Sequence, residues 1–174
     1  MILAVDPGIG GCGVALAVPG RLVRAGYVKS PRKKAGDPCS DAVLAARAVW
    51  RWVWNERETI ARALVEWPRV YPAGKAKRGA DPNDLLLLAG VDAAIAVLLD
   101  CPVESIYPRD WKGTLDPDIV CDRIRDELLT PEERARVELP SAKSLHHNVY
   151  DACGIALHAL NRGPVNGRTR VFPR

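Results

Sequence analysis

The sequence has none of the patterns that mark a zinc-binding, disulfide-rich or membrane-spanning protein. Its five cysteines include no C-x-x-C pair, which argues against both a zinc site and a disulfide framework. Asp or Gly interrupts the longest apolar runs well before bilayer length, and no basic segment followed by an apolar stretch precedes the first predicted strand. Internal repeats and low-complexity tracts are also missing. We therefore expect a soluble, cytoplasmic protein with reduced thiols and no membrane contact.

Length and composition favour a single domain. The chain has 174 residues, of which 48% are hydrophobic, enough for one full core and too few for two comfortable domains. We predict one domain over residues 1–174, with a basic C-terminal tail at about 163–174.

The basic residues gather in three segments where acids are missing, although the formal net charge is only +4. A polyanion such as a nucleic acid is the natural partner of such clusters. The alternative is a solvated basic surface without a partner, which is less attractive for the second cluster because it follows Glu66 directly. The clusters are Lys29, Arg32, Lys33 and Lys34; Arg69, Lys75, Lys77 and Arg78; and Arg162, Arg168, Arg170 and Arg174.

Three carboxylates form the most informative pattern in the sequence. Asp6 and Glu66 each close a short apolar run, and Asp151 stands near the start of a helix-like stretch. An acid at the end of a buried strand is unfavourable unless it is paired or binds a cation. If both strands end at one edge of one sheet, a helix can add the third carboxylate and complete a magnesium site.

The order of predicted elements is that of an α/β fold with a mixed five-stranded sheet flanked by helices. The apolar patterns predict a three-strand antiparallel meander first and parallel strands after it. A right-handed crossover places the fourth strand parallel to and near the first, so that Asp6 and Glu66 share an edge. The predicted strands are 2–5, 14–18, 22–28, 60–65 and 103–107, and the predicted helices are 40–54, 84–99, 117–129, 131–137 and 148–160.

The later helices differ in their expected surroundings. Apolar residues circle most of the helix at 84–99, for which Asn83 is the predicted N-cap, so the core or a dimer interface must cover more than one of its sides. The acids of the helices at 117–129 and 131–137, Glu133 among them, alternate with arginines and are expected to face solvent.

Three segments resemble the motifs of RuvC-type Holliday-junction resolvases, which belong to the ribonuclease H-like superfamily. In that family a strand ends in Asp-Pro-Gly and a glycine-bearing turn leads to a second strand, as at residues 2–16 here. Residues 64–68 are similar to the family's second motif, and residues 147–156 are similar to its last. The compact chain and residues 108–112 look more like the phage-encoded branch, which implies a bacterial cell as the setting.

The resemblance implies a crossover junction endodeoxyribonuclease with a ribonuclease H-like fold, a hydrolase that cuts four-way DNA junctions. Two Mg²⁺ ions, for which Mn²⁺ can substitute, would lie roughly 3.5 to 4 Å apart and activate the attacking water. In that scheme Asp6 bridges the ions, and Glu66 and Asp151 each hold one.

The fourth position of the site separates this sequence from the bacterial members, which usually carry an Asp or a His three residues before the helix Asp. Here Asn148 stands three residues before Asp151, and His147 stands four before it. Both spacings put a side chain on the same helical face. We expect His147 to be the catalytic and metal-site residue, because an imidazole can bind a metal or carry a proton, with Asn148 as the alternative.

The resemblance also indicates which residues contact DNA. Glycines after the first strand would let a phosphate backbone come close without a Cβ in the way, and aromatics interleaved with basic residues after Glu66 could stack on an unpaired base. The alternative is that Trp67 caps the core and Tyr71 is an exposed turn residue. The predicted DNA-contacting residues are Gly10, Gly11, Trp67, Arg69, Tyr71, Lys75, Lys77, Arg78 and Lys112.

A four-way junction offers two equivalent cleavage sites, so a resolvase should be a homodimer. We expect the dimer to pack partly through the helix at 84–99 or through the first helix. The predicted N-cap of that first helix is Ser40 or Asp41. The helix carries three alternating tryptophans, Trp50, Trp52 and Trp54, which are expected to pack in the core or at the dimer interface.

Two other functions stay open at the level of sequence. A related ribonuclease H-like nuclease acting on flap DNA or RNA precursors would share the metal site and differ in substrate. A metal-free junction-binding scaffold would keep the basic surface and would need neither Glu66 nor Asp151.

Overall fold

The computed structural model describes residues 1–31, 36–68 and 82–164. Within these ranges, no helix is long and apolar enough to cross a bilayer. The strands are β1 (Ile2–Asp6), β2 (Gly11–Val18), β3 (Arg21–Lys29), β4 (Arg62–Glu66) and β5 (Val103–Ile106). The helices are α1 (Pro38–Trp52), α2 (Pro82–Leu98), α3 (Pro108–Trp111), α4 (Pro117–Arg123), α5 (Pro131–Arg134) and α6 (His146–Ala159), with 3₁₀ turns η1 (Arg57–Thr59) and η3 (Lys143–Leu145) and a π-helical segment η2 (Ile124–Leu128).

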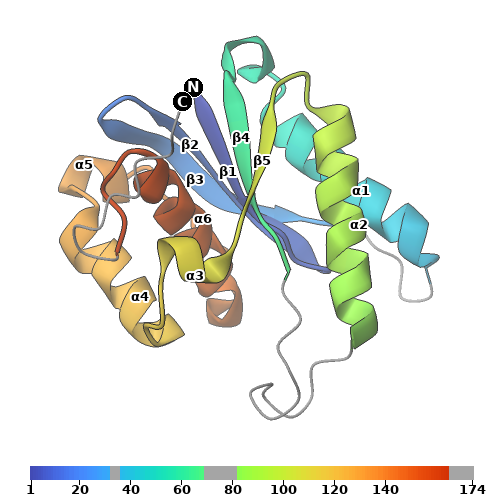
Figure 1. Ribbon diagram of the computed structural model, residues 1–174. Coiled ribbons are helices and arrows are strands. Elements are labelled where there is room, and N and C mark those ends of the chain that lie inside the picture. Colours follow the sequence, from blue (N-terminus) through green and yellow to red (C-terminus); the bar gives the residue numbers. More distant parts are fainter. Residues whose placement is uncertain (32–35, 69–81, 165–174) are drawn as a thin grey trace.

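The five strands form one mixed sheet in the order β3-β2-β1-β4-β5 (Figure 1). The first three strands pair antiparallel, whereas β4 pairs parallel with β1 and β5 pairs parallel with β4. The 15-residue helix α1 connects β3 to β4. It returns the chain to the end of the sheet at which β1 begins, as the parallel pairing of β4 with β1 requires. The predicted meander followed by parallel strands is confirmed.

Helices cover both faces of the sheet (Figure 1). Residues of α1 and α2 form one hydrophobic core with Leu3 and Val5 of β1, whereas residues of α6 form a second core with Ala4. Alternate residues of a strand point to opposite faces, which is how β1 contributes to both cores. Burial on two sides explains why the sequences of β1 and β4 are nearly continuous apolar runs.

Three helices, α1, α2 and α6, each begin two residues earlier than the sequence predicted. The N-cap of α1 is Asp37, whose carboxylate accepts the backbone N–H of Ser40 at 2.8 Å, so the predicted cap at Ser40 or Asp41 is wrong. Helix α2 begins at Pro82, which places Asn83 inside the helix and not at its N-cap. A proline is tolerated in the first turn because the N–H that it lacks would have no helical partner there.

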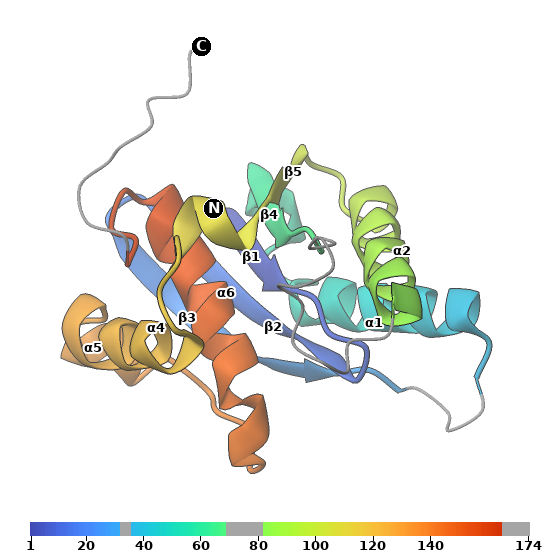
Figure 2. The same cartoon turned by 60° about the horizontal axis from the view of Figure 1, so that its bottom comes forward.

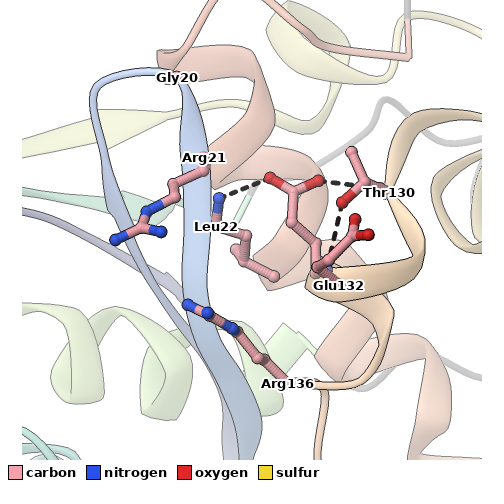
Figure 3. A pocket seen from close by; sticks show the side chains of 7 residues that line it. Gly20, Arg21, Leu22, Thr130, Glu132 and Arg136 are labelled. Carbon is pink, nitrogen blue, oxygen red and sulfur yellow. Dashed lines mark hydrogen bonds between the residues drawn. The ribbon is translucent and has the colours of Figure 1, made fainter.

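Glu133 is buried, which corrects the prediction that the acids of this region face solvent. Its carboxylate accepts the backbone N–H of Leu22 at 2.7 Å and two N–H groups of Arg162 at 2.7 and 2.8 Å. The hydrogen bonds from Arg162 lower the pKa of Glu133 to about 2. Figure 3 shows the hollow beside this contact, at the β2–β3 turn. Arg162, predicted as part of a basic cluster, is therefore engaged in an internal ion pair.

Candidate metal centre

The ends of two neighbouring parallel strands bring Asp6 and Glu66 together. Val5 of β1 is the register partner of Val65 of β4, so the acid that follows each valine lies at the same edge of the sheet. Both valines point into the core beneath α1 and α2, and strand alternation therefore directs both acids to the opposite face. Helix α6 lies on that face, together with α3 (Figure 2).

Helix α6 supplies the third carboxylate, Asp151. Oxygen atoms of Asp6, Glu66 and Asp151 all lie within 4.8 Å of one another, the only group of this kind that histidines, cysteines and acids form within the described residues. A close backbone approach makes this possible. A Cβ on Gly13 of β2 would lie 1.8 Å from the carbonyl oxygen of Asn148, so only glycine lets the first turn of α6 rest on the strand.

Burial and the charges of neighbouring acids make Asp6 and Glu66 unfavourable as free anions. Burial first, and then the charges of Glu66 and Asp151, hold the pKa of Asp6 well above its usual range. Burial also raises the pKa of Glu66, with Lys112 acting against the shift and Asp151 adding to it. A nearby cation favours the ionised form of a carboxylate. Lys112 is one such cation, and a divalent metal ion would be a stronger one, because clustered carboxylate oxygens are the ligands that Mg²⁺ prefers.

Helix α3 and the residue after it contact two of the acids. The indole N–H of Trp111 donates to Glu66 Oε2 at 2.7 Å, and the ammonium of Lys112 donates to Asp151 Oδ2 at 2.8 Å. The side chain of Trp111 is fully buried. The sequence predicts that Lys112 contacts DNA, and the contacts of this lysine with the acids are not among its predictions.

The two candidates for the fourth position lie differently. His147 is exposed and does not join the acidic group, whereas Asn148 is partly buried. The side-chain nitrogen of Asn148 lies 3.7 Å from the point where a Cβ on Gly8 would be, beside the loop that follows Asp6. The assignment of His147 stays a prediction, and the geometry favours Asn148.

Only part of the predicted DNA-contacting set can be placed. Gly10 is exposed, whereas Gly11 is buried with φ 151° and a Cβ there would lie 2.4 Å from a backbone oxygen of β3. Trp67 is partly buried, and its backbone N–H donates to the carbonyl of Ile106 at 2.9 Å. Five predicted residues lie outside the described residues, namely Arg69, Tyr71, Lys75, Lys77 and Arg78, as do Arg32, Lys33, Lys34, Arg168, Arg170 and Arg174 of the basic clusters.

Sequence reasoning missed a fourth acid near the site, Asp92 of α2. Its side chain is buried, and neither carboxylate oxygen has a hydrogen-bond partner within the part of the chain that the structure describes. Burial, and then the charge of Glu66, raises the pKa of Asp92 to about 8. The available signal was a single acid inside the apolar run of α2.

Solved Holliday-junction resolvases resemble this structure over most of its length. RuvC of T. thermophilus in complex with a Holliday junction substrate has a TM-score of 0.60 at 20% identity, over 91% of this chain and 92% of that chain. A second Thermus thermophilus RuvC structure has a TM-score of 0.55 at 20% identity, over 91% and 93%. The yeast mitochondrial Holliday junction resolvase has a TM-score of 0.51 at 12% identity, over 92% and 78%.

No known family model matches the sequence, and no curated protein matches it. The structural likeness at these identities establishes the fold. The protein has the ribonuclease H-like fold of RuvC, with a mixed five-stranded sheet between helices, which confirms the predicted fold class.

Proposed function

We propose that this protein is a metal-dependent endonuclease that cuts four-way DNA junctions. The observation that carries the proposal is the convergence of Asp6, Glu66 and Asp151, with oxygens within 4.8 Å of one another, in a fold shared with Holliday junction resolvases. The RuvC structure in complex with a Holliday junction substrate supports the same substrate class for this chain.

The residues of the acidic group suit a pair of Mg²⁺ ions, with Mn²⁺ as a substitute. Two such ions polarise a phosphoryl group and generate a nucleophilic water near neutral pH. Asp6 would contact both ions, and Glu66 and Asp151 would each hold one. The chain orients these ligands before any ion arrives, because Trp111 holds an oxygen of Glu66 and α6 presents Asp151 to the sheet edge.

The remaining site residues have supporting roles in this proposal. His147 or Asn148 would complete a coordination shell or orient the attacking water. Gly10 offers an exposed backbone in the loop that follows Asp6, and Trp67 follows Glu66 directly. DNA phosphates would be held by the basic residues after Trp67, namely Arg69, Lys75, Lys77 and Arg78, with Tyr71 stacking on an unpaired base.

A homodimer would place two such sites on one junction. Apolar side chains on α2 are available for this contact, because Leu86 and Val97 are 72% and 84% exposed. Beside Val97, at the end of α2, Leu98 lines a hollow together with Trp50, Arg47 and Arg51 of α1. A second copy of the chain packed on α1 and α2 would cover these residues and leave the acidic group, on the other face of the sheet, open to DNA.

The setting that we propose is the cytoplasm of a bacterial cell, with a phage gene as the source. All five cysteines are free, as expected in a reducing compartment. The resemblance of residues 108–112 to the phage-encoded branch supports the second part.

The test is a cleavage assay on four-way, three-way, flap and duplex DNA and on RNA, each with Mg²⁺, Mn²⁺ or EDTA. We expect paired, symmetric cuts in the four-way junction only when a divalent ion is present. Glu66→Gln should remove the activity, whereas the matched control Glu104→Gln should not, because Glu104 is an exposed carboxylate on the neighbouring strand that pairs with Arg62 at 3.2 Å.

Other outcomes would assign a different function. Metal-dependent cutting of flap DNA or RNA without junction cleavage would identify a related nuclease. Tight junction binding without cleavage under any metal, unchanged in Glu66→Gln, would identify a scaffold.

A further inference from the structure

The side chain of Lys112 lies among the acids of the proposed metal centre. Its Nζ atom is 2.8 Å from Asp151 Oδ2 and 3.7 Å from Glu66 Oε2, and the side chain is only 16% exposed. The ring of Trp111 lies 4.6 Å from the same ammonium. An oxygen of Asp151 that a metal ion would use is therefore already occupied by a cation of the chain itself.

The backbone of Lys112 is anchored, so the fold places the root of this side chain beside the acids. Its N–H donates to the carbonyl of Pro108 at 2.9 Å, which ends helix α3. The preceding residue, Trp111, is fully buried against Gly154 of α6, where a Cβ would come within 2.3 Å of the indole ring. Helix α6 thus holds both Asp151 and the segment that delivers the lysine.

Electrostatics make the ammonium and a metal ion competitors. The ammonium of Lys112 lies within ion-pair distance of both Asp151 Oδ2 and Glu66 Oε2, so it is held between two negative charges. A divalent cation bound to Asp151 would stand next to this positive charge in a poorly solvated place, where like charges repel strongly. Both cations also need the same carboxylate lone pairs.

We propose that Lys112 is the internal counter-ion of the acidic cluster and that its ammonium must leave Asp151 before a divalent cation binds. Lys112 therefore lowers the apparent metal affinity of the site and stabilises the fold while no metal is present. The inference rests on the proposed function only in taking the acidic cluster as a metal site.

Calorimetric titration of Mn²⁺ into the full-length protein without DNA tests the competition. Lys112→Met should bind Mn²⁺ about tenfold more tightly than the wild type, because a repelling charge is gone. Lys112→Arg keeps the charge and should bind like the wild type. The matched control Lys143→Met changes an exposed lysine in the turn before α6 and should also bind like the wild type. Equal or weaker binding by Lys112→Met would overturn the proposal.

Thermal unfolding gives a second readout that does not need an active enzyme. In EDTA, Lys112→Met should unfold at a lower temperature than the wild type, and adding Mn²⁺ should raise its unfolding temperature by more than it raises that of the wild type. If Lys112→Met does not fold in EDTA, the same comparison is made with Lys112→Gln. An equal Mn²⁺-induced increase in variant and wild type would count against the proposal.

The failure of this inference and the failure of the proposed function are distinguishable. Tighter Mn²⁺ binding by Lys112→Met without junction cleavage by the wild type would keep the counter-ion role and reject the junction nuclease. Metal-dependent junction cleavage with equal Mn²⁺ affinities would keep the nuclease and reject the counter-ion role.

Discussion

The indole N–H of Trp111 donates a 2.7 Å hydrogen bond to Glu66 Oε2, joining residues that are 45 positions apart in the chain. The indole is fully buried, so this contact is shielded from water. The hydrogen bond holds the carboxylate at the end of β4 in one orientation, because the indole that donates it is itself locked in the core. Positioning of this kind, by a neighbour that does not bind the metal, is common around metal ligands.

Trp111→Phe should therefore weaken both the fold and the site. We expect a loss of about 1–3 kcal/mol in the free energy of unfolding, because a buried carboxylate oxygen loses a donor, and reduced cleavage at limiting Mg²⁺. Urea unfolding and a Mg²⁺ titration of junction cleavage measure the two effects. The control is Trp54→Phe. Trp54 is 43% exposed, so this substitution should change neither the free energy of unfolding nor the Mg²⁺ dependence by much. Unchanged Mg²⁺ dependence in Trp111→Phe would show that the hydrogen bond does not orient Glu66.

The three carboxylates should be needed for cleavage and dispensable for binding. Asp6→Asn, Glu66→Gln and Asp151→Asn should each lower the cleavage rate by about a hundredfold or more, since even residues behind metal ligands contribute 10–100-fold. Junction affinity in EDTA should be kept or improved, because negative charge is removed. Gel-shift and cleavage assays on one junction measure both. Full activity in any one variant would remove that residue from the site.

Asp6→Asn should also stabilise the metal-free protein at neutral pH. Burial and the neighbouring acids raise the pKa of Asp6, so the wild-type fold must either keep a proton or bear a buried charge there. A neutral amide avoids both, and we expect Asp6→Asn to have a higher free energy of unfolding than the wild type in EDTA at neutral pH, a difference that disappears in acid. Urea unfolding at two pH values checks this, and a loss of stability at neutral pH would contradict it.

Asp92 should make the metal-free protein less stable as the pH rises. Its pKa is about 8 in the fold against an ordinary value of 3.8, so the folded state holds a proton that the unfolded state releases. The contribution of Asp92 to the free energy of unfolding is fully present below about pH 4, and it is lost as the pH rises toward about 8. The free energy of unfolding of Asp92→Asn should therefore exceed that of the wild type increasingly across this window, by on the order of 5 kcal/mol at its upper end.

Unfolding in EDTA at several pH values measures this difference between Asp92→Asn and the wild type. The matched control is Asp100→Asn, an exposed acid just after the same helix, which should change the free energy of unfolding by less than about 0.5 kcal/mol. A constant difference between Asp92→Asn and the wild type at all pH values would exclude a titrating Asp92.

Alanine substitutions separate the two candidates for the fourth site position. The placement of Asn148 beside Gly8 leads us to expect that Asn148→Ala lowers junction cleavage by about tenfold or more, while the exposed His147 can be replaced by Ala with little loss. Junction affinity should change in neither variant. Strong impairment of His147→Ala alone would instead restore the assignment that the sequence favoured.

The sequence by itself determined the strands, their order and the meeting of the acids. A strand pattern is local, and the parallel return of the chain through α1 is forced by the length of the connection. Once β1 and β4 are parallel neighbours, Asp6 and Glu66 must reach one edge, and the resemblance of residues 147–156 to the last family motif pointed to Asp151 as their partner. These conclusions need no knowledge of side-chain contacts.

Only the tertiary structure decided which groups surround the buried acids of this protein. Lys112 and Asp151 are 39 positions apart, and Glu133 meets Leu22 across 111 positions. No periodicity relates such residues, because their contact depends on how α3, α5 and α6 pack against the sheet. The burial of Asp92 depends likewise on which side of α2 turns inward, which an almost uniformly apolar helix does not encode in its pattern.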